Sequence, residues 1–276
     1  MGRQNPTVII ALGGNAISPK NEAGTINQQF EHTRYSLKGV MSFVKKRYNI
    51  CITHGNGPQV GAELLKTEMT ESVIPPLPLG LLVANTQGAI GYMIQQILQN
   101  KLRQIKVDRE VVTLVTQVLV NKNDESIKNP TKFVGARYTK KKIDKLAKKL
   151  SWNVKEQEPD SWRRVVPSPM PEYIMHGKSI KALVDRGTIV IAFGGGGIPV
   201  FNNKEGQIEG LDAVIDKDFS AAKMGRIIRA QELWIISDID YLYRNFGTEN
   251  STPIKEIDTK ELKSLYNRNI FQEGTI

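Results

Sequence analysis

The chain has 276 residues, 40% of them hydrophobic and 24% charged, so it can bury a sizeable core and is not intrinsically disordered. A single cysteine excludes a disulfide framework and a cysteine-rich zinc module, and no apolar run is long enough to span a bilayer, so we expect a soluble, cytoplasmic protein without a membrane partner. The 38 Lys and Arg residues against 28 Asp and Glu give a net charge of +10, which makes nucleic acid a partner to consider.

Apolar and β-branched runs predict buried strands, and helical periodicity fills the intervals between them. The strands are expected at residues 8–12, 50–53, 111–120, 188–193 and 233–237. Helical stripes cover residues 26–44 and 90–98, and a third helix is expected from Asp218 to about Glu232. Strands with nearly continuous apolar character are typical of a parallel sheet covered on both faces, so the fold class is α/β.

Glycine-rich loops follow three of these strands. They are Gly13-Gly14-Asn15, the segment 54–61 and the segment 194–197. Ligands of open α/β sheets bind beyond the carboxyl ends of the strands, and glycine lets backbone N–H groups approach an anion closely. The loops therefore predict a phosphate or carboxylate site, with plain tight turns as the alternative. Neither the P-loop nor the dinucleotide-binding pattern is present.

Charged residues able to do chemistry lie at two further junctions. Asp216-Lys217-Asp218 precedes the third helix, where Lys217 opposes the helix dipole and Asp218 is a suitable N-cap by type. Lys132 is the last residue of a turn-type tetrapeptide at residues 129–132 and is either functional or ordinary surface. His54 adjoins a glycine loop but has no serine or cysteine nucleophile pattern beside it, so histidine chemistry is not expected.

The positive charge is concentrated in residues 121–170. This segment holds 13 Lys and Arg against 6 Asp and Glu, a net charge of +7. Its lysine-rich stretch at residues 140–150 has apolar residues at helical spacing, which predicts an amphipathic helix with a solvated basic face. A nucleic-acid motif is missing, and attraction of a small polyanion stays open.

The motifs together resemble those of carbamate kinases. The resemblance rests on residues 8–17, 53–61, 86–92, 116–118, 129–132, 162–169, 194–200 and 213–218, in the family's order. Segments 129–132 and 162–169 favour carbamate kinases over other amino acid kinases that act on a different small acceptor.

The resemblance implies a three-layer αβα sandwich with a mainly parallel open sheet, the amino acid kinase fold. Residues 1–187 would form a carbamate and carbamoyl-phosphate lobe with a protruding basic subdomain at about 121–170, and residues 188–276 a nucleotide-binding lobe. The implied reaction is reversible phosphoryl transfer between carbamoyl phosphate and MgADP, with Mg²⁺ carried by the nucleotide and no metal site of the protein. The resemblance also implies that the protein forms a homodimer and serves arginine breakdown by the deiminase route. It does not imply a nucleic-acid partner.

The family's site residues carry over by position. Donors to the carbamate and the transferring phosphoryl group would be Gly13, Gly14, Asn15, Gly55, Asn56 and Gly57. Catalytic roles fall on Lys132 and Lys217, which would approach the phosphoryl oxygens, on Asp218, which would orient the lysines, and on Asp216 nearby. Lys217, Ser237, Asp238 and Tyr243 would contact the nucleotide.

The end of the sequence departs from this pattern. Family members run on for a few dozen residues and carry a Pro-Lys whose lysine reaches the ATP phosphates. Either the sequence is part of a longer chain, or the natural protein is shortened. The alternative function is therefore a truncated, weakly active or non-catalytic paralogue that binds nucleotide.

Overall fold

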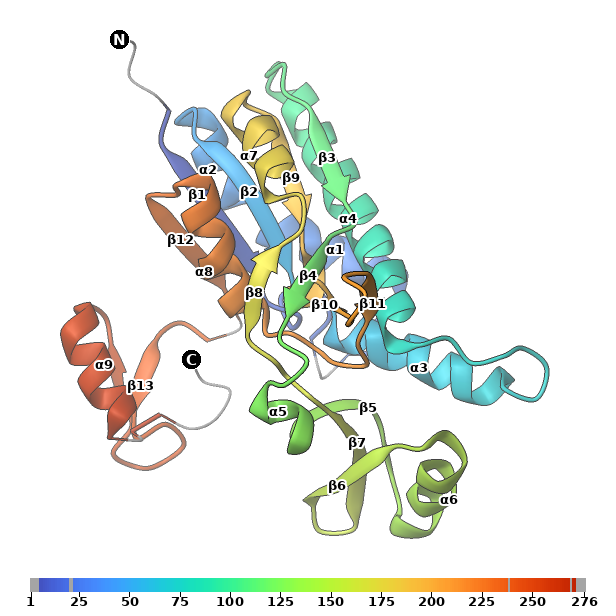
Figure 1. The fold of residues 1–276 in the computed structure, drawn as a ribbon. Coiled ribbons are helices and arrows are strands. Elements are labelled where there is room, and N and C mark those ends of the chain that lie inside the picture. The colour runs from blue at the N-terminus through green and yellow to red at the C-terminus, as the bar shows by residue number, and fades with distance from the viewer. Residues whose placement is uncertain (1–4, 20–21, 238, 269, 272–276) are drawn as a thin grey trace. The chain divides into compact units, whose positions relative to one another are not determined.

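The computed structural model describes residues 5–19, 22–237, 239–268 and 270–271. The chain forms two compact units, which meet in sequence between Ile236 and Ser237. Figure 1 shows the elements of both units. The lobes predicted at residues 1–187 and 188–276 divide the chain by the ligand that each would bind, whereas the two units are separated by their internal contacts, so the predicted lobes stay a prediction.

The first unit is built on a five-stranded sheet in which every pair of neighbours is parallel. The order β12-β1-β2-β9-β3 comprises β1 (Thr7–Leu12), β2 (Asn49–His54), β3 (Val111–Leu114), β9 (Ile189–Ala192) and β12 (Glu232–Ile236). All five carboxyl ends therefore lie along one edge of the sheet, as expected from the apolar runs.

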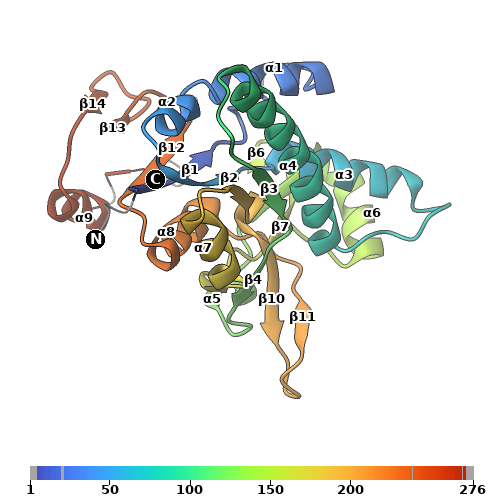
Figure 2. The same ribbon diagram turned by 90° about the horizontal axis from the view of Figure 1, so that it is seen from above.

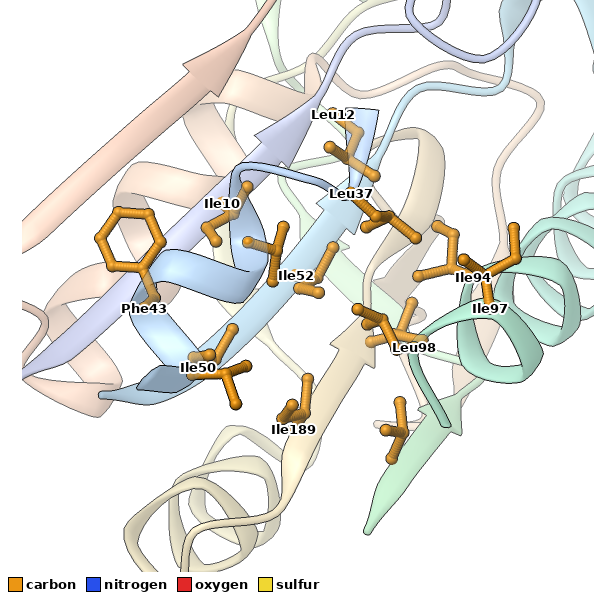
Figure 3. Close-up of a cluster of buried hydrophobic side chains, with 14 of the residues drawn as sticks. Ile10, Leu12, Leu37, Phe43, Ile50, Ile52, Ile94, Ile97, Leu98 and Ile189 are labelled. Carbon is orange, nitrogen blue, oxygen red and sulfur yellow. The ribbon is translucent and has the colours of Figure 1, made fainter. Parts of the chain in front are cut away.

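Alternate residues of these strands enter two different cores. Ile10, Ile52 and Ile189 belong to the core under α1 (Ile26–Ser36), α2 (Val40–Lys45) and α4 (Leu79–Gln104), and Figure 3 shows part of it. Ile9 and Cys51 belong to the core under α7 (Gly177–Asp185) and α8 (Lys217–Ile228). Figure 2 shows the two groups of helices on opposite faces of the sheet. This confirms the predicted three-layer αβα sandwich with a mainly parallel sheet.

The strand expected over residues 111–120 is two strands, and this prediction was wrong. β3 ends at Leu114, whereas β4 (Gln117–Val120) belongs to a second sheet. The break is held by Gln87 of α4, whose Oε1 accepts from Thr116 N at 2.8 Å. The second sheet has the order β11-β10-β4-β8, with β8 (Pro171–Ile174), β10 (Ile198–Asn202) and β11 (Ile208–Gly210).

Two of the predicted helices have other bounds in the structure than the sequence predicted. The stripe over residues 26–44 is split between α1 and α2, and its first residue, Ile26, is 61% exposed. The third helix runs over Lys217–Ile228 instead of reaching Glu232, because Arg229 adopts the left-handed region at φ 56° and ends it. Glu232 then begins β12.

The basic segment forms a small antiparallel sheet beside two helices. It contains α5 (Glu125–Lys128), β5 (Lys132–Tyr138), α6 (Lys140–Leu150), β6 (Asn153–Glu158) and β7 (Ser161–Val166). As the periodicity predicts, α6 buries Ile143 and exposes its lysines. Tyr138 donates a hydrogen bond to Glu68 of α3 (Gly57–Thr70), which ties this subdomain to a helix that starts at the predicted site.

The second unit consists of a two-stranded antiparallel sheet and one helix among its described residues. These are β13 (Leu242–Arg244), β14 (Thr252–Ile254) and α9 (Thr259–Asn267), whose N-terminus is capped by Asp258. Across the described part of both units, no helix combines the length and the apolar character needed to cross a membrane.

Candidate active site

The glycine loops after β1 and β2 lie against each other. A Cβ atom at Gly55 would come within 2.6 Å of the backbone nitrogen of Gly14, a distance that no side chain could occupy. Each loop is also fixed to a neighbouring strand, because Gly13 N donates to Ile236 O at 2.7 Å and Gly55 N to Leu12 O at 2.8 Å. Close backbone approach, rather than a simple tight turn, therefore explains the glycine at position 55.

The loop after β9 packs on the loop after β2. A Cβ at Gly194 would lie 2.3 Å from the His54 ring, and one at Gly195 would lie 2.2 Å from the side-chain amide of Asn56. Gly195 also has a φ of +66°, which favours glycine. The three glycine loops predicted from the sequence thus meet at one edge of the sheet.

Two helices begin at this meeting point. Asn56 is the N-cap residue of α3, is 6% exposed and donates from Nδ2 to Thr86 Oγ1 at 2.9 Å. The first turn of α8 contacts the third loop, since Ser220 Oγ donates to Gly196 O at 2.7 Å. Helix N-termini carry partial positive charge and free N–H groups, so the loops and helices together form an environment suited to an anion.

The four charged residues predicted to be catalytic form one chain of contacts. Asp216 caps α8 by accepting from Asp218 N at 2.9 Å, and its other oxygen lies 3.3 Å from Lys132 Nζ. Lys217 Nζ pairs with both carboxylate oxygens of Asp218, at 2.9 and 2.8 Å. The alternative in which Asp218 is the N-cap is wrong, because Asp216 fills that position. Lys132 opens β5, so it reaches this cluster from the subdomain.

His54 and Gln87 also hold these loops, and the sequence reasoning assigned neither of them a role. His54 is 1% exposed and its Nδ1 donates to Gly55 O at 3.0 Å. Burial lowers the pKa of His54 to about 4, so the ring is neutral near pH 7. Gln87 Nε2 donates to Gly194 O at 3.0 Å. The sequence does contain a signal for Gln87, because it is a polar residue three positions before Ile90 on an otherwise apolar helical stripe. A buried polar side chain needs hydrogen-bond partners, so this position could have been predicted to hold neighbouring backbone groups.

The structure describes the surroundings of the remaining predicted site residues in less detail. Asn15 is half-buried in the first loop, and Gly57 is the first residue of α3. Asp238 lies outside the described residues. Ser237 and Tyr243 belong to the second unit, where the Tyr243 ring centroid is 5.6 Å from that of Phe246, and their nucleotide role stays a prediction.

The amino acid kinase family profile matches residues 6–276. Curated carbamate kinases of Pyrococcus horikoshii and Thermococcus kodakarensis are each 42% identical to this chain, over 98% of it and 86% of the relative. The chain belongs to the carbamate kinases. A solved carbamate kinase from Giardia lamblia bound to AMP-PNP superposes with a TM-score of 0.90 at 35% identity, over 98% of this chain and 85% of that one. Membership of the carbamate kinases confirms the resemblance read from the glycine loops and the Asp216–Asp218 segment.

Proposed function

We propose that the protein is a carbamate kinase, which moves a phosphoryl group reversibly between carbamoyl phosphate and MgADP to give ATP and carbamate. In the reverse direction ATP phosphorylates carbamate, which forms from ammonia and carbon dioxide. The observation that carries this proposal is the pairing of Lys132 with Asp216 and of Lys217 with Asp218 beside three converging glycine loops.

The loops would hold the acceptor and the moving group. Phosphoryl transfer requires in-line positioning and neutralisation of charge on the transferred oxygens, with little covalent help from the protein. Backbone N–H groups of Gly13, Gly14, Gly55 and Gly57 and the side chains of Asn15 and Asn56 would supply donors. Their close packing fixes these donors before the substrate arrives, so little reorganisation remains at the moment of transfer.

The lysines would neutralise the transferred group from two sides. Lys132 comes from the subdomain and Lys217 from the first turn of α8, and each is paired with a carboxylate. Asp216 and Asp218 would keep the two ammonium groups close together in spite of their mutual repulsion. A bound phosphoryl group would then give both lysines a more highly charged partner.

We place the nucleotide on the lobe of residues 188–276, with Lys217, Ser237, Asp238 and Tyr243 as its contacts. Mg²⁺ enters as part of the substrate MgADP or MgATP. The described residues contain no group of three or more His, Cys, Asp or Glu side chains arranged to hold a metal, and Mg²⁺ bound through substrate phosphates needs only one or two carboxylates.

The family resemblance supports three broader proposals. These are a homodimer, a cytoplasmic location and a role in arginine catabolism by the deiminase route. Sedimentation equilibrium would test the first, because a mass near 30.9 kDa would contradict a dimer.

The central test is a coupled assay for ATP made from carbamoyl phosphate and MgADP. We expect Lys132→Ala and Lys217→Ala to lower kcat about 100- to 1000-fold while the protein stays folded. Lys128→Ala on α5 and Lys223→Ala on α8 are the matched controls and should keep nearly full turnover. Wild-type turnover in either test variant would remove that lysine from the mechanism, and failure of the unmodified chain to make ATP would favour the non-catalytic paralogue.

A further inference from the structure

A large hollow lies at the amino end of the parallel sheet, at the opposite end of the strands from the glycine loops. It has a volume of about 680 Å³ and is lined where the chain enters β2, β3 and β9. In Figure 1 these strand starts lie at the top and the subdomain at the bottom. β2 has six residues, so the hollow and the glycine loops are about 20 Å apart, and the two sites can be tested separately.

Positive charge dominates the lining. The lining contains four cationic residues, Lys45, Arg47, Arg109 and Arg186, and two acidic residues, Asp108 and Glu110, which gives it a net charge of +2. None of the six forms an ion pair with another residue that the structure describes. Cations gathered in one hollow repel each other, and a bound anion would relieve that repulsion.

Arg109 is fixed in the wall of the hollow with one donor left over. Its Nε donates to Gly187 O at 2.6 Å and its Nη1 to Tyr48 O at 2.9 Å. The remaining nitrogen, Nη2, is buried and has no hydrogen-bond partner among the described residues. Nη2 is closed off from the hollow, so what Arg109 offers a ligand there is the positive charge of its guanidinium, and because this group is already held in place, its attraction for an anion costs little conformational entropy.

The backbone at Arg47 adopts the same left-handed conformation that ends α8 at Arg229. Arg47 follows the C-terminus of α2 with a φ of 60°, in the left-handed region that favours glycine. A non-glycine side chain is less favourable than glycine in this conformation. Glycine would form this turn more easily, yet it would remove a cationic side chain from the hollow.

We propose that this hollow binds a small oxyanion with two or more negative charges, of the phosphate or carboxylate class, at a site separate from the kinase site. The net charge of the lining matches a ligand of that charge, and guanidinium groups recognise both phosphate and carboxylate oxygens through paired hydrogen bonds. The site stands on Arg47, Arg109 and Arg186, none of which has a part in the proposed phosphoryl transfer.

Isothermal titration calorimetry of the full chain without Mg²⁺ tests this site, with inorganic pyrophosphate as the phosphate probe and malonate as the carboxylate probe. The test protein is Arg47→Gln/Arg186→Gln, because both side chains are exposed and their loss should leave the fold intact. Arg103→Gln on α4 removes an exposed arginine outside the hollow and is the matched control. Lys217→Ala separates this site from pyrophosphate binding at the kinase site.

We expect binding in the hollow to weaken tenfold or more in the double variant and to stay within twofold of wild type in Lys217→Ala and Arg103→Gln, whereas any second event, at the kinase site, should weaken in Lys217→Ala. A preference for pyrophosphate would assign the ligand to phosphates, and a preference for malonate to carboxylates. Absence of binding at millimolar probe, loss of all binding in Lys217→Ala, or equal weakening by Arg103→Gln would each overturn the proposal. If the double variant melts early, a crystal soaked in tungstate decides the matter by anomalous density, or its absence, in the hollow.

Discussion

Lys132 and Asp216 lie 84 positions apart in the sequence, yet Lys132 Nζ is 3.3 Å from Asp216 Oδ2. The other oxygen of the same carboxylate caps α8. One side chain therefore both starts the helix that carries Lys217 and holds a lysine from the subdomain. The two roles can be separated, because asparagine is as good an N-cap as aspartate but carries no charge.

Asp216→Asn should leave the stability of the protein nearly unchanged and lower kcat about 100-fold, because Lys132 loses the charge that positions it. Asp216→Ala should show the same loss of kcat and in addition lose about 1 kcal/mol of unfolding free energy with the cap. Urea unfolding and the coupled ATP assay measure the two effects. Asp124→Ala, which removes the cap of α5, should cost stability with little change in kcat. Full activity in Asp216→Asn would show that its charge is not needed.

Gly195→Ala should destabilise the protein by more than about 2 kcal/mol, because the new methyl group overlaps the Asn56 amide and its backbone has a positive φ. The ATP assay should show a parallel loss of turnover, since Asn56 would have to move. Gly206→Ala is matched for positive φ, at +77°, but has open space around it. That control should lose only about 1 kcal/mol and keep its activity. Equal effects of the two substitutions would mean that backbone strain alone, and not the contact with Asn56, matters.

Gln87→Leu should lower the free energy of unfolding by about 2–4 kcal/mol, because it leaves the buried N–H of Thr116 unpaired and removes a donor from Gly194 O. Gln95→Leu on the same helix removes a single side-chain hydrogen bond, to Thr113, and should cost less. Urea denaturation of both variants at pH 7 gives the comparison. A smaller loss for Gln87→Leu than for Gln95→Leu would contradict the proposed anchoring of the loops.

Gln87 also shows where prediction from the sequence stops. The αβα class and the glycine loops could be predicted because apolar runs, helical periodicity and Gly-Gly pairs are local patterns. The break inside residues 111–120 could not be predicted in this way, because it depends on a hydrogen bond to Gln87, which lies on a helix 29 positions earlier in the sequence. For the same reason, the residues alone left Lys132 as either surface or site; the family resemblance predicted that it approaches the transferred phosphoryl group, and its pairing with Asp216 appears only in the structure.

The neutral state of His54 makes the stability of the protein depend on pH. Burial lowers the pKa of His54 from an ordinary 6.5 to about 4 in the folded chain. Between these values the unfolded chain binds a proton that the folded chain does not, so acid favours unfolding. The contribution of His54 is complete above pH 6.5 and is lost progressively as the pH falls toward 4, by about 3 kcal/mol in all.

His54→Gln keeps a side-chain donor but cannot take up this proton. Its free energy of unfolding should therefore fall less than that of wild type between pH 7 and pH 4, and the difference between the two proteins should appear below pH 6.5. Urea denaturation at half-unit pH steps measures both curves, and the carboxylates common to both proteins cancel in the comparison. Parallel curves would show that folding leaves the pKa of His54 at its ordinary value, and the packed ring against Gly194 would then take up a positive charge below pH 6.5 in a site without a partner for it.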